Sequence, residues 1–349
     1  MSTFERIADL PLQVDQVGCE ALSQALGQWT RATTVVELSG GGHSGRGEDV
    51  TYDPALHPPF QERLPGLPLT GSHTLRSFSA LLESIDLFEG APPTMLAYTD
   101  YRRWAVESAA LDLALLQSGL SLGDAVGREP QPVRFVASLG LGKPPSIEPV
   151  KRRMAAAPDV GLKLDATSEW TDELIADLVS LDRVEAIDLK GAYHGTTVDQ
   201  PADPDLYRRV VEAFPYALIE DPALTPETDA ILAPHRDRVT WDAVIHTVGD
   251  VQKLPFPPKV INVKPSRSGS LETLFGLYDH LAANGIGAYG GGQTELSVGR
   301  GHIQTLAAHF HPDASNDVAP REFNLPETPA KLPASPLELD LSRPGFGPR

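Results

Sequence analysis

The chain carries VEAIDLKG at residues 184–191, YALIEDP at 216–222, RVTWDAV at 238–244 and VINVKPS at 260–266. Each run is rich in Val, Ile and Ala, which is typical of strands buried on both faces. A polar, helix-like segment follows each run, and strands alternating with helices build a parallel sheet or barrel. Each run also has an ionisable residue at or near its end: Asp188, Glu220, Asp242 or Lys264. Because chemistry in such folds collects at the carboxyl ends of the strands, these four residues mark the candidate site.

The same pattern extends in both directions along the chain. VRFVASL (133–139) and GLKLDA (161–166) precede the four runs, and GIGAYGGG (285–292) follows them. Successive anchor residues are about 22 to 32 positions apart, the length of one strand, one helix and two short loops; the anchors are Lys163, Asp188, Glu220, Asp242, Lys264 and Tyr289. Seven or eight such units between residues 133 and 320 favour a closed barrel over an open sheet.

The N-terminal part has a different pattern, which predicts α+β structure. TTVVEL (33–38) and GEDVTY (47–52) are expected to pair as a hairpin within residues 32–53. The glycine-rich residues 40–47 between them are either a plain turn or a mobile flap over the site. Helices are expected over residues 75–87 and from about residue 99 to Gly119, a residue suited to ending a helix. The proline-rich tail, residues 321–349, either packs on another domain or is partly frayed.

Composition limits the classes of partner and the compartment. The 349 residues carry a formal net charge of −18, which argues against nucleic acid and against an anionic membrane surface. No apolar run approaches the roughly 18 residues that span a bilayer, and the N-terminus lacks the pattern of a signal peptide. The single cysteine, Cys19, cannot form an internal disulfide, so a reducing, cytoplasmic setting is expected.

Asp188, Glu220 and Asp242 form the candidate metal site. They follow three successive strands, and ionised carboxylates with apolar neighbours must be paired or must bind metal. A set of oxygen ligands without Cys or His favours Mg²⁺ or Mn²⁺ over Zn²⁺. The alternative is that each residue is a helix N-cap or a solvated loop acid. Three acids in the same position relative to their strands favour the metal.

Lys163 and Lys264 form the candidate acid/base pair. Each lies in an apolar run, on strands on either side of the acidic residues. A lysine buried beside a divalent cation is expected to have a lowered pKa, which suits a base. Strands on opposite walls of a barrel would let the two amines approach a substrate from opposite faces. The alternative, compatible with this one, is that each lysine pairs structurally with a carboxylate.

YGGGQTELSVGR (289–300) supplies weaker signals. Its glycines let the backbone approach a ligand, so Tyr289, Gly291 and Gly292 are candidate substrate-binding residues. Glu295 stands near the start of a helix, where a carboxylate is also stabilised simply by the helix dipole. The histidines show no metal-ligand spacing and are expected to be core or surface residues. His194 and His246 are the two best placed to reach the pocket from loops.

On these residues the chain resembles the enolase superfamily, specifically its mandelate racemase/muconate lactonizing enzyme family and most of all the muconate lactonizing subgroup. The resemblance covers most of the chain. GRGEDV resembles the hairpin of the family's capping domain, and ESAALDLALLQSGLSLGDAVG resembles the helix before its barrel. GLKLD, AIDLKG, LIEDP, TWDAVIHTVGDV, INVKPSRSG and GGGQTELSVGR occur in the order expected for strands two to seven.

The resemblance implies an α/β fold, a modified TIM-like (β/α)7β barrel over residues 129–320. It also implies an α+β capping domain over residues 1–128, to which the tail 321–349 returns. It makes Asp188, Glu220 and Asp242 the Mg²⁺ ligands, with Mn²⁺ as a possible substitute. Lys163 and Lys264 become the acid/base lysines. Glu295 becomes the electrophilic carboxyl, which hydrogen-bonds the substrate carboxylate.

The chain departs from the family pattern at three positions. Gly161 replaces the first lysine of Lys-x-Lys, Lys190 replaces the asparagine of Asp-x-Asn, and Ala243 replaces the glutamate of Asp-Glu-Ser. Lys190 therefore either pairs with Asp188 or binds a substrate anion. These departures affect the expected substrate and reaction more than the expected fold or metal.

The shared chemistry of the family is removal of the proton α to a carboxylate, which gives a metal-stabilised enediolate. The first expectation is an isomerase, that is a racemase, epimerase or cycloisomerase, acting on a small-molecule carboxylate. The second is a β-eliminating lyase or dehydratase of an acid sugar or dicarboxylate. The third is a low-activity barrel that binds metal and ligand. A homo-oligomer is expected, because such barrels commonly assemble.

Overall fold

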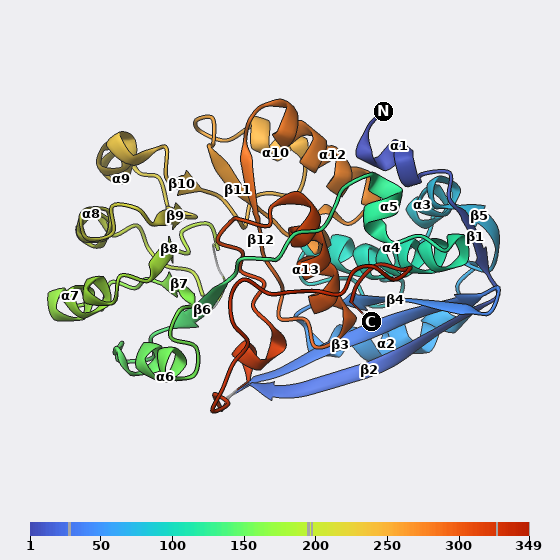
Figure 1. Cartoon of the computed structure of the whole chain (residues 1–349), viewed down its shortest axis with the longest axis horizontal. Helices are drawn as coiled ribbons and strands as arrows, with labels where there is room; N and C mark the ends of the chain where they lie inside the picture. Colours follow the sequence, from blue (N-terminus) through green and yellow to red (C-terminus); the bar gives the residue numbers. More distant parts are fainter. Residues whose placement is uncertain (27–28, 194–195, 197, 326, 349) are drawn as a thin grey trace.

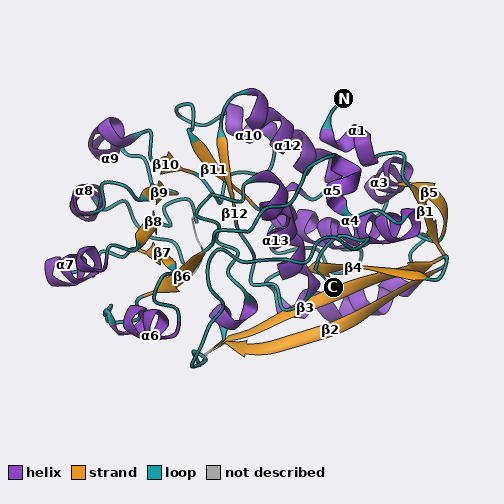
Figure 2. Ribbon diagram, in the orientation of Figure 1, coloured by secondary structure: helices purple, strands orange, loops and turns teal. Residues whose placement is uncertain are grey.

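A computed structural model of the protein describes residues 1–26, 29–193, 196, 198–325 and 327–348. Figure 1 shows an N-terminal α+β segment beside a larger α/β segment. Figure 2 shows the long strands of the first segment at one end of the molecule and the short strands of the second at the other. Helices α6 to α9 lie on the outer side of those short strands. The predicted combination of α/β and α+β structure is therefore present.

In the described part of the N-terminal segment there are five strands and five α-helices. The strands are β1 (Pro11–Val14), β2 (Gln16–Leu26), β3 (Trp29–Gly40), β4 (His43–Asp49) and β5 (Gly71–Thr74). The helices are α1 (Thr3–Ile7), α2 (His57–Arg63), α3 (Leu75–Glu83), α4 (Ala97–Ser118) and α5 (Leu122–Val126), with 3₁₀ turns η1 (Pro54–Leu56) and η2 (Leu64–Gly66). Strands β2, β3 and β4 form an antiparallel sheet in that order, and β1 pairs with β5. The predicted helix ending at Gly119 is confirmed, with Gly119 in a left-handed conformation at φ 67°.

The glycine-rich residues 40–47 are not a flap. Five residues of this region belong to β4 (43–49), which pairs with β3 as far as Gly40 and His43 and leaves a two-residue turn. A Cβ on Gly47 would lie 2.0 Å from the carbonyl oxygen of Ala105, and one on Gly45 would lie 2.2 Å from a backbone nitrogen of α4. These glycines therefore let β4 pack against a helix. The flap expectation is wrong because glycine here serves close packing rather than backbone freedom.

The α/β segment has seven short strands among its described residues. They are β6 (Val136–Gly140), β7 (Gly161–Asp165), β8 (Val184–Asp188), β9 (Leu218–Glu220), β10 (Val239–Thr240), β11 (Val260–Val263) and β12 (Gly287–Gly290). The helices are α6 (Glu148–Ala156), α7 (Asp172–Leu181), α8 (Pro204–Ala213), α9 (Pro226–Leu232), α10 (Val248–Gln252), α11 (Pro265–Ser268), α12 (Leu271–Ala283) and α13 (Val298–Phe310), with 3₁₀ turns η3 (Ala233–His235) and η4 (Arg321–Asn324).

These strands pair in parallel in two sheets. One sheet has the order β10-β9-β8-β7-β6, and the other consists of β11 and β12. Single contacts join the two sheets: Asn262 N donates to Trp241 O at 3.0 Å, and isolated bridges link Asn316 to Phe135 and Asp317 to Gly291. The predicted parallel α/β fold is confirmed. Continuous strand pairing around a closed barrel is not present among the described residues, so full closure stays a prediction.

Several of the helices that follow the strands begin directly after an N-cap residue. Thr171, Asp203, Thr225 and Ser270 each accept a hydrogen bond from a backbone N–H in the first turn of α7, α8, α9 and α12. These caps fix where each strand–helix loop ends. The polar residues at the strand ends therefore lie along one edge of the sheet, each before a helix whose start is fixed by its cap.

The C-terminal residues run back along both segments. Leu337 bridges to Val133, and the Gly345 N–H donates to Leu120 O at 2.9 Å. Phe346 is buried against Trp104 of α4, with ring centroids 6.1 Å apart. Over the residues that the structure describes, no helix combines the length and the apolar character needed to span a bilayer.

Candidate active site

Three acidic residues form a row at the carboxyl ends of β7, β8 and β9. The pairing register places Asp165 opposite Asp188 and Asp188 opposite Glu220. Asp188 and Glu220 are fully buried. Asp242 lies two residues after the end of β10, which is the strand next to β9 in the sheet. The sequence prediction that these acids gather at one rim agrees with this register.

A group of three carboxylates is close enough to hold one metal ion. Asp188, Glu220 and Asp221 each offer an oxygen, and these oxygens lie within 4.8 Å of one another. Asp221 was not predicted, although it follows Glu220 directly in LIEDP. Its φ of 47° turns the backbone just after β9. Its two carboxylate oxygens accept hydrogen bonds from the N–H groups of Asp242 (2.8 Å) and Ala243 (2.9 Å).

The electrostatics of this group suit a divalent cation. Burial raises the pKa of Glu220 well above its usual range, and Asp188, Asp242 and Asp221 raise it further against the opposing effect of Lys163. Burial together with Asp242 and Asp188 raises the pKa of Asp221 to about 6. Such shifts mark crowded negative charge, which a hard cation with oxygen ligands would relieve. The residues present therefore fit Mg²⁺ or Mn²⁺.

Asp242 is surrounded by donors from neighbouring loops. Lys264 Nζ lies 2.8 Å from Oδ2, Arg267 Nη1 lies 2.5 Å from Oδ1, and the Tyr193 hydroxyl donates to Oδ2 at 2.9 Å. Burial alone would raise the pKa of Asp242, but Arg267 and Lys264 outweigh it and hold this pKa well below its usual range. Asp242 therefore stays a predicted metal ligand. Arg267 and Tyr193 are site residues that the sequence did not single out.

Lys163 lies beneath the acidic row, on β7. Its Nζ lies 2.5 Å from Glu220, 3.6 Å from Asp188 and 3.4 Å from Asp317. Burial would lower the pKa of Lys163, but Glu220, Asp317 and Asp188 together raise it well above its usual range. Three acids beside the amine account for this raised pKa, and the lowered pKa expected beside a bound divalent cation stays a prediction.

Lys190 occupies both oxygens of Asp188. Its backbone N–H donates to Oδ1 at 2.9 Å, and its ammonium donates to Oδ2. The same ammonium lies 3.2 Å from Asp165. A left-handed backbone, with φ 52°, allows the side chain to fold back in this way. The sequence left two roles open for Lys190, pairing with Asp188 or binding a substrate anion, and the structure shows the pairing with Asp188.

The residues in and after β12 divide into two groups. The Tyr289 hydroxyl donates to Glu220 beneath the rim, and Tyr289 is buried. Gly291 lets the backbone pass close to Lys264, since a Cβ there would lie 2.6 Å from its Cε. Glu295 is directed elsewhere: its carboxylate lies 2.8 Å from Arg300 and accepts the Gln293 N–H at 2.6 Å. Glu295 is not among the residues lining the pocket described next.

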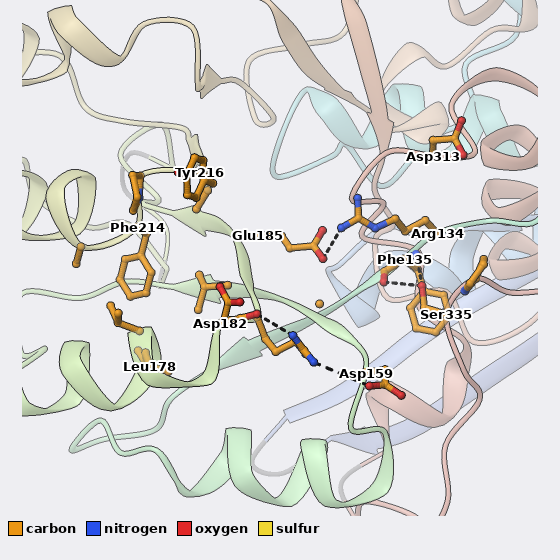
Figure 3. A pocket seen from close by; sticks show the side chains of 18 of the residues that line it. Arg134, Phe135, Asp159, Leu178, Asp182, Glu185, Phe214, Tyr216, Asp313 and Ser335 are labelled. Carbon is orange, nitrogen blue, oxygen red and sulfur yellow. Dashed lines mark hydrogen bonds and ion pairs between the residues drawn. The ribbon is translucent and has the colours of Figure 1, made fainter.

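A pocket of about 730 Å³ opens above the carboxyl ends of the strands. Lys190, Lys264, Arg267 and Gly292 line it from the α/β segment, and several aromatic residues line it from the N-terminal segment. A larger hollow, of about 1000 Å³, lies at the opposite, amino ends of β7 and β8 (Figure 3). There Arg134 pairs with Glu185 at 2.6 Å, far from the acid/base residues. Position relative to the strands therefore identifies the smaller pocket as the candidate site.

The two predicted histidines do not add catalytic groups to the described site. His194 lies outside the described residues. His246 Nδ1 is 3.1 Å from the carbonyl oxygen of Arg267 and 3.4 Å from Asp100. His246 therefore links the loop after β10 to the start of α4 and to α11.

Comparison with family models identifies the family of the chain. Two family models match the chain: "Domain of unknown function (DUF8230) N-terminal domain" over residues 5–125 and "Domain of unknown function (DUF8230) C-terminal domain" over residues 129–325. A search of curated proteins gives no match.

Solved structures share the fold at low sequence identity. A dipeptide epimerase from Methylococcus capsulatus complexed with Mg ion is 17% identical, with a TM-score of 0.68 over 96% of this chain and 99% of that chain. A muconate cycloisomerase from Pseudomonas fluorescens is 18% identical, with a TM-score of 0.60 over 88% and 87%. A member of the enolase superfamily from Listeria innocua Clip11262 is 17% identical, with a TM-score of 0.63 over 96% and 92%. The chain belongs to the family described as a domain of unknown function (DUF8230), and it has the fold of the enolase superfamily.

Proposed function

We propose that the protein is an Mg²⁺-dependent isomerase that removes the proton α to the carboxylate of a small molecule. One observation carries the proposal: two lysines from different sheets end on one group of buried carboxylates. Lys163 reaches Glu220 and Asp188 from β7, whereas Lys264 reaches Asp242 from the end of β11. Amines that reach a site from two walls can take a proton from one face of a carbon and return one to the other.

The chain would hold the metal through Asp188, Glu220 and Asp221, with Asp242 as a further predicted ligand. When bound, Mg²⁺ supplies positive charge that stabilises the negative charge developing on the substrate carboxylate. Mn²⁺ would use the same oxygen donors. The dipeptide epimerase with the same fold was solved with Mg ion, which supports this choice of metal.

The lysines carry the proton transfers. Lys163 is 2% exposed and Lys264 is 8% exposed, so neither amine exchanges freely with bulk solvent. A proton taken from the α carbon therefore stays on the amine through one proton transfer, and it is replaced from ²H₂O between turnovers. Return of a proton from the opposite side inverts the carbon, and return to the same side restores it. Lys190 and Gly292 line the pocket and are proposed to contact the substrate.

Proton exchange is the test of this function. The Mg²⁺-loaded protein is incubated with a panel of carboxylic acids in ²H₂O, and the α proton is followed by NMR. Exchange without loss of water supports the isomerase. Exchange with formation of a keto acid or double bond would instead indicate a lyase, and absence of exchange for every acid would favour a binding protein.

Lysine variants test the assignment of roles. Lys163→Ala and Lys264→Ala are each expected to lower the exchange rate by about 10²–10⁴-fold, the usual contribution of a general acid or base. Lys151→Ala is the control, because the Lys151 side chain is 60% exposed and pairs with Glu148, one turn earlier in α6. Circular dichroism confirms that each variant is folded. A lysine variant that exchanges at the wild-type rate removes that lysine from the mechanism.

A further inference from the structure

The mouth of the pocket is apolar and comes from separate parts of the chain. Trp29 begins β3, Tyr52 follows β4, Met95 precedes α4, and Val198 lies in the loop between β8 and α8. Three of these four residues belong to the N-terminal segment, and the fourth comes from the α/β segment. Their convergence on one opening is therefore a product of the tertiary fold, and it does not follow from one apolar stretch of sequence.

These mouth residues leave much apolar surface in water. Trp29 is 44% exposed, Tyr52 36%, Met95 46% and Val198 46%, and they account for nearly half of the exposed large hydrophobic residues in the described part of the chain. Trp29 and Tyr52 also lie together, with ring centroids 6.2 Å apart. Apolar surface gathered at the rim of a cavity is typical of a ligand-binding site.

The polar groups of the pocket already have partners. Lys190 pairs with Asp188, and both Lys264 and Arg267 pair with Asp242. Gln293 accepts a hydrogen bond from the Tyr52 hydroxyl at 3.2 Å and donates one to the Tyr101 hydroxyl at 2.8 Å. A ligand with many hydroxyl groups would lose hydration here without gaining matched partners, which is costly. A second anionic group on the ligand would also lack a partner, because the cationic side chains of the pocket already pair with Asp188 or Asp242.

We propose that the substrate is a monocarboxylate whose body beyond the α carbon is a large apolar or aromatic group. The carboxylate end rests on the function proposed above. The body lies at the pocket mouth against Trp29, Tyr52, Met95 and Val198, where its burial removes apolar surface of both partners from water. The volume of about 730 Å³ accommodates a substrate larger than a simple two- or three-carbon acid.

Three 2-hydroxy acids separate this proposal from its alternatives. Lactate, 3-phenyllactate and gluconate share the same acid end and differ in a methyl, an aromatic or a polyhydroxyl body. Binding of each to the full-length protein with saturating Mg²⁺ is measured by calorimetry. 3-Phenyllactate is expected to bind at least about tenfold more tightly than both others, because an apolar contact of modest area is enough for that ratio. Equal affinities, or tightest binding of gluconate, would overturn the proposal.

Variants locate the effect at the mouth. Trp29→Ala and Met95→Ala should each weaken 3-phenyllactate binding severalfold and leave lactate binding unchanged, while Trp29→Phe should retain most of the preference. Tyr216→Ala is the control, since Tyr216 is 95% exposed at the opposite end of the strands. If both mouth variants bind all three acids like the wild type, the apolar body does not lie there.

The two proposals fail in different experiments. Calorimetry measures the affinity of each acid for the pocket, whether or not the protein converts it. Proton exchange measures removal of the α proton. Selective binding of 3-phenyllactate without exchange of any acid would retain the apolar pocket and reject the isomerase. Exchange of gluconate, with weaker binding of 3-phenyllactate, would retain the chemistry and reject the apolar body.

Discussion

Lys190 competes with any metal for Asp188, because its N–H and its ammonium take both carboxylate oxygens. Lys190→Asn, which restores the residue type usual at this position of the family motif, is expected to tighten Mg²⁺ binding about tenfold or more. Removing a unit charge a few ångströms away alters electrostatic energies by more than that ratio requires. Calorimetric titration of the apoprotein with Mg²⁺ gives the answer, with the exposed Lys151→Asn as control. Unchanged or weaker affinity in Lys190→Asn would show that Lys190 is no competitor.

His311 is expected to make stability depend on pH. Its Nδ1 lies 2.6 Å from the Asn316 amide oxygen and its Nε2 lies 3.0 Å from the Tyr278 hydroxyl. Burial lowers the pKa of His311 to about 4, from an ordinary value of 6.5. Between pH 6.5 and pH 4, His311 is protonated in the unfolded chain but stays neutral in the folded protein. The free energy of unfolding therefore falls as the pH drops toward 4. The loss between pH 7.5 and pH 5 is about 2 kcal/mol.

The test is urea unfolding of the wild type and His311→Gln at both pH values. The variant is less stable at pH 7.5, but it should lose roughly 2 kcal/mol less than the wild type on going to pH 5. The difference between the two proteins cancels the titration of all other groups. Parallel pH curves would exclude His311 as a source of acid sensitivity.

At the scale of elements, the contact of β4 with α4 depends on glycine. Gly47→Ala would place a methyl group 2.0 Å from the Ala105 carbonyl oxygen, and the helix backbone has little room to move. We expect a loss of about 1–3 kcal/mol in unfolding free energy, as for overpacked interiors. Gly18→Ala in β2 is the matched control, since a Cβ there meets nothing within 4 Å. Equal stability of the two variants in urea would contradict this account of the β4 glycines.

The elements show what sequence pattern can and cannot predict. The apolar runs that end at Asp188 and Glu220 are strands β8 and β9, because a buried parallel strand needs uniformly apolar residues on both faces. The long strand β2 was missed, since QVGCEALSQAL is half exposed and lacks clear alternation. The glycines of β4 were misread because a glycine that permits packing and one that permits motion look alike in sequence.

In the candidate site, the sequence predicts where residues lie along the chain but not where their side chains point. Asp188, Glu220 and Lys264 meet because each sits at or next to a strand end, and Lys163 reaches them from the middle of β7; sequence spacing reveals these positions. The direction of Glu295 toward Arg300 depends on tertiary contacts that spacing does not encode. The same applies to the arrival of Arg267 at Asp242, three residues beyond a lysine that pattern did identify.

At the scale of the whole molecule, the N-terminal segment holds the loop that follows β12. Arg31 is fully buried, and it donates to the carbonyl oxygens of Gln293 at 2.9 Å and Thr294 at 3.1 Å. It also donates to Val50 and Thr51 of its own segment, at 2.7 Å each. Glu48 accepts three backbone N–H groups from residues 296–299. Gln293 and Gly292 of the same loop line the pocket, so the joint between the two segments also shapes the site.

Arg31→Leu should therefore weaken both the fold and the pocket. It leaves five carbonyl oxygens without this donor, three of them in buried hydrogen bonds. Unpaired buried groups cost about 1–3 kcal/mol each before relaxation, so we expect a loss of about 3 kcal/mol or more in urea unfolding. Arg76→Leu is the control: Arg76 is 45% exposed beside Glu5, and an exposed pair contributes at most about 1 kcal/mol. Binding of 3-phenyllactate should also weaken in Arg31→Leu under conditions where the variant is folded, because Gln293 and Thr294 lose their anchor. If Arg31→Leu unfolds at the wild-type urea concentration, the loop after β12 is held by Glu48 and by its own segment, and the N-terminal arginine is dispensable to the joint.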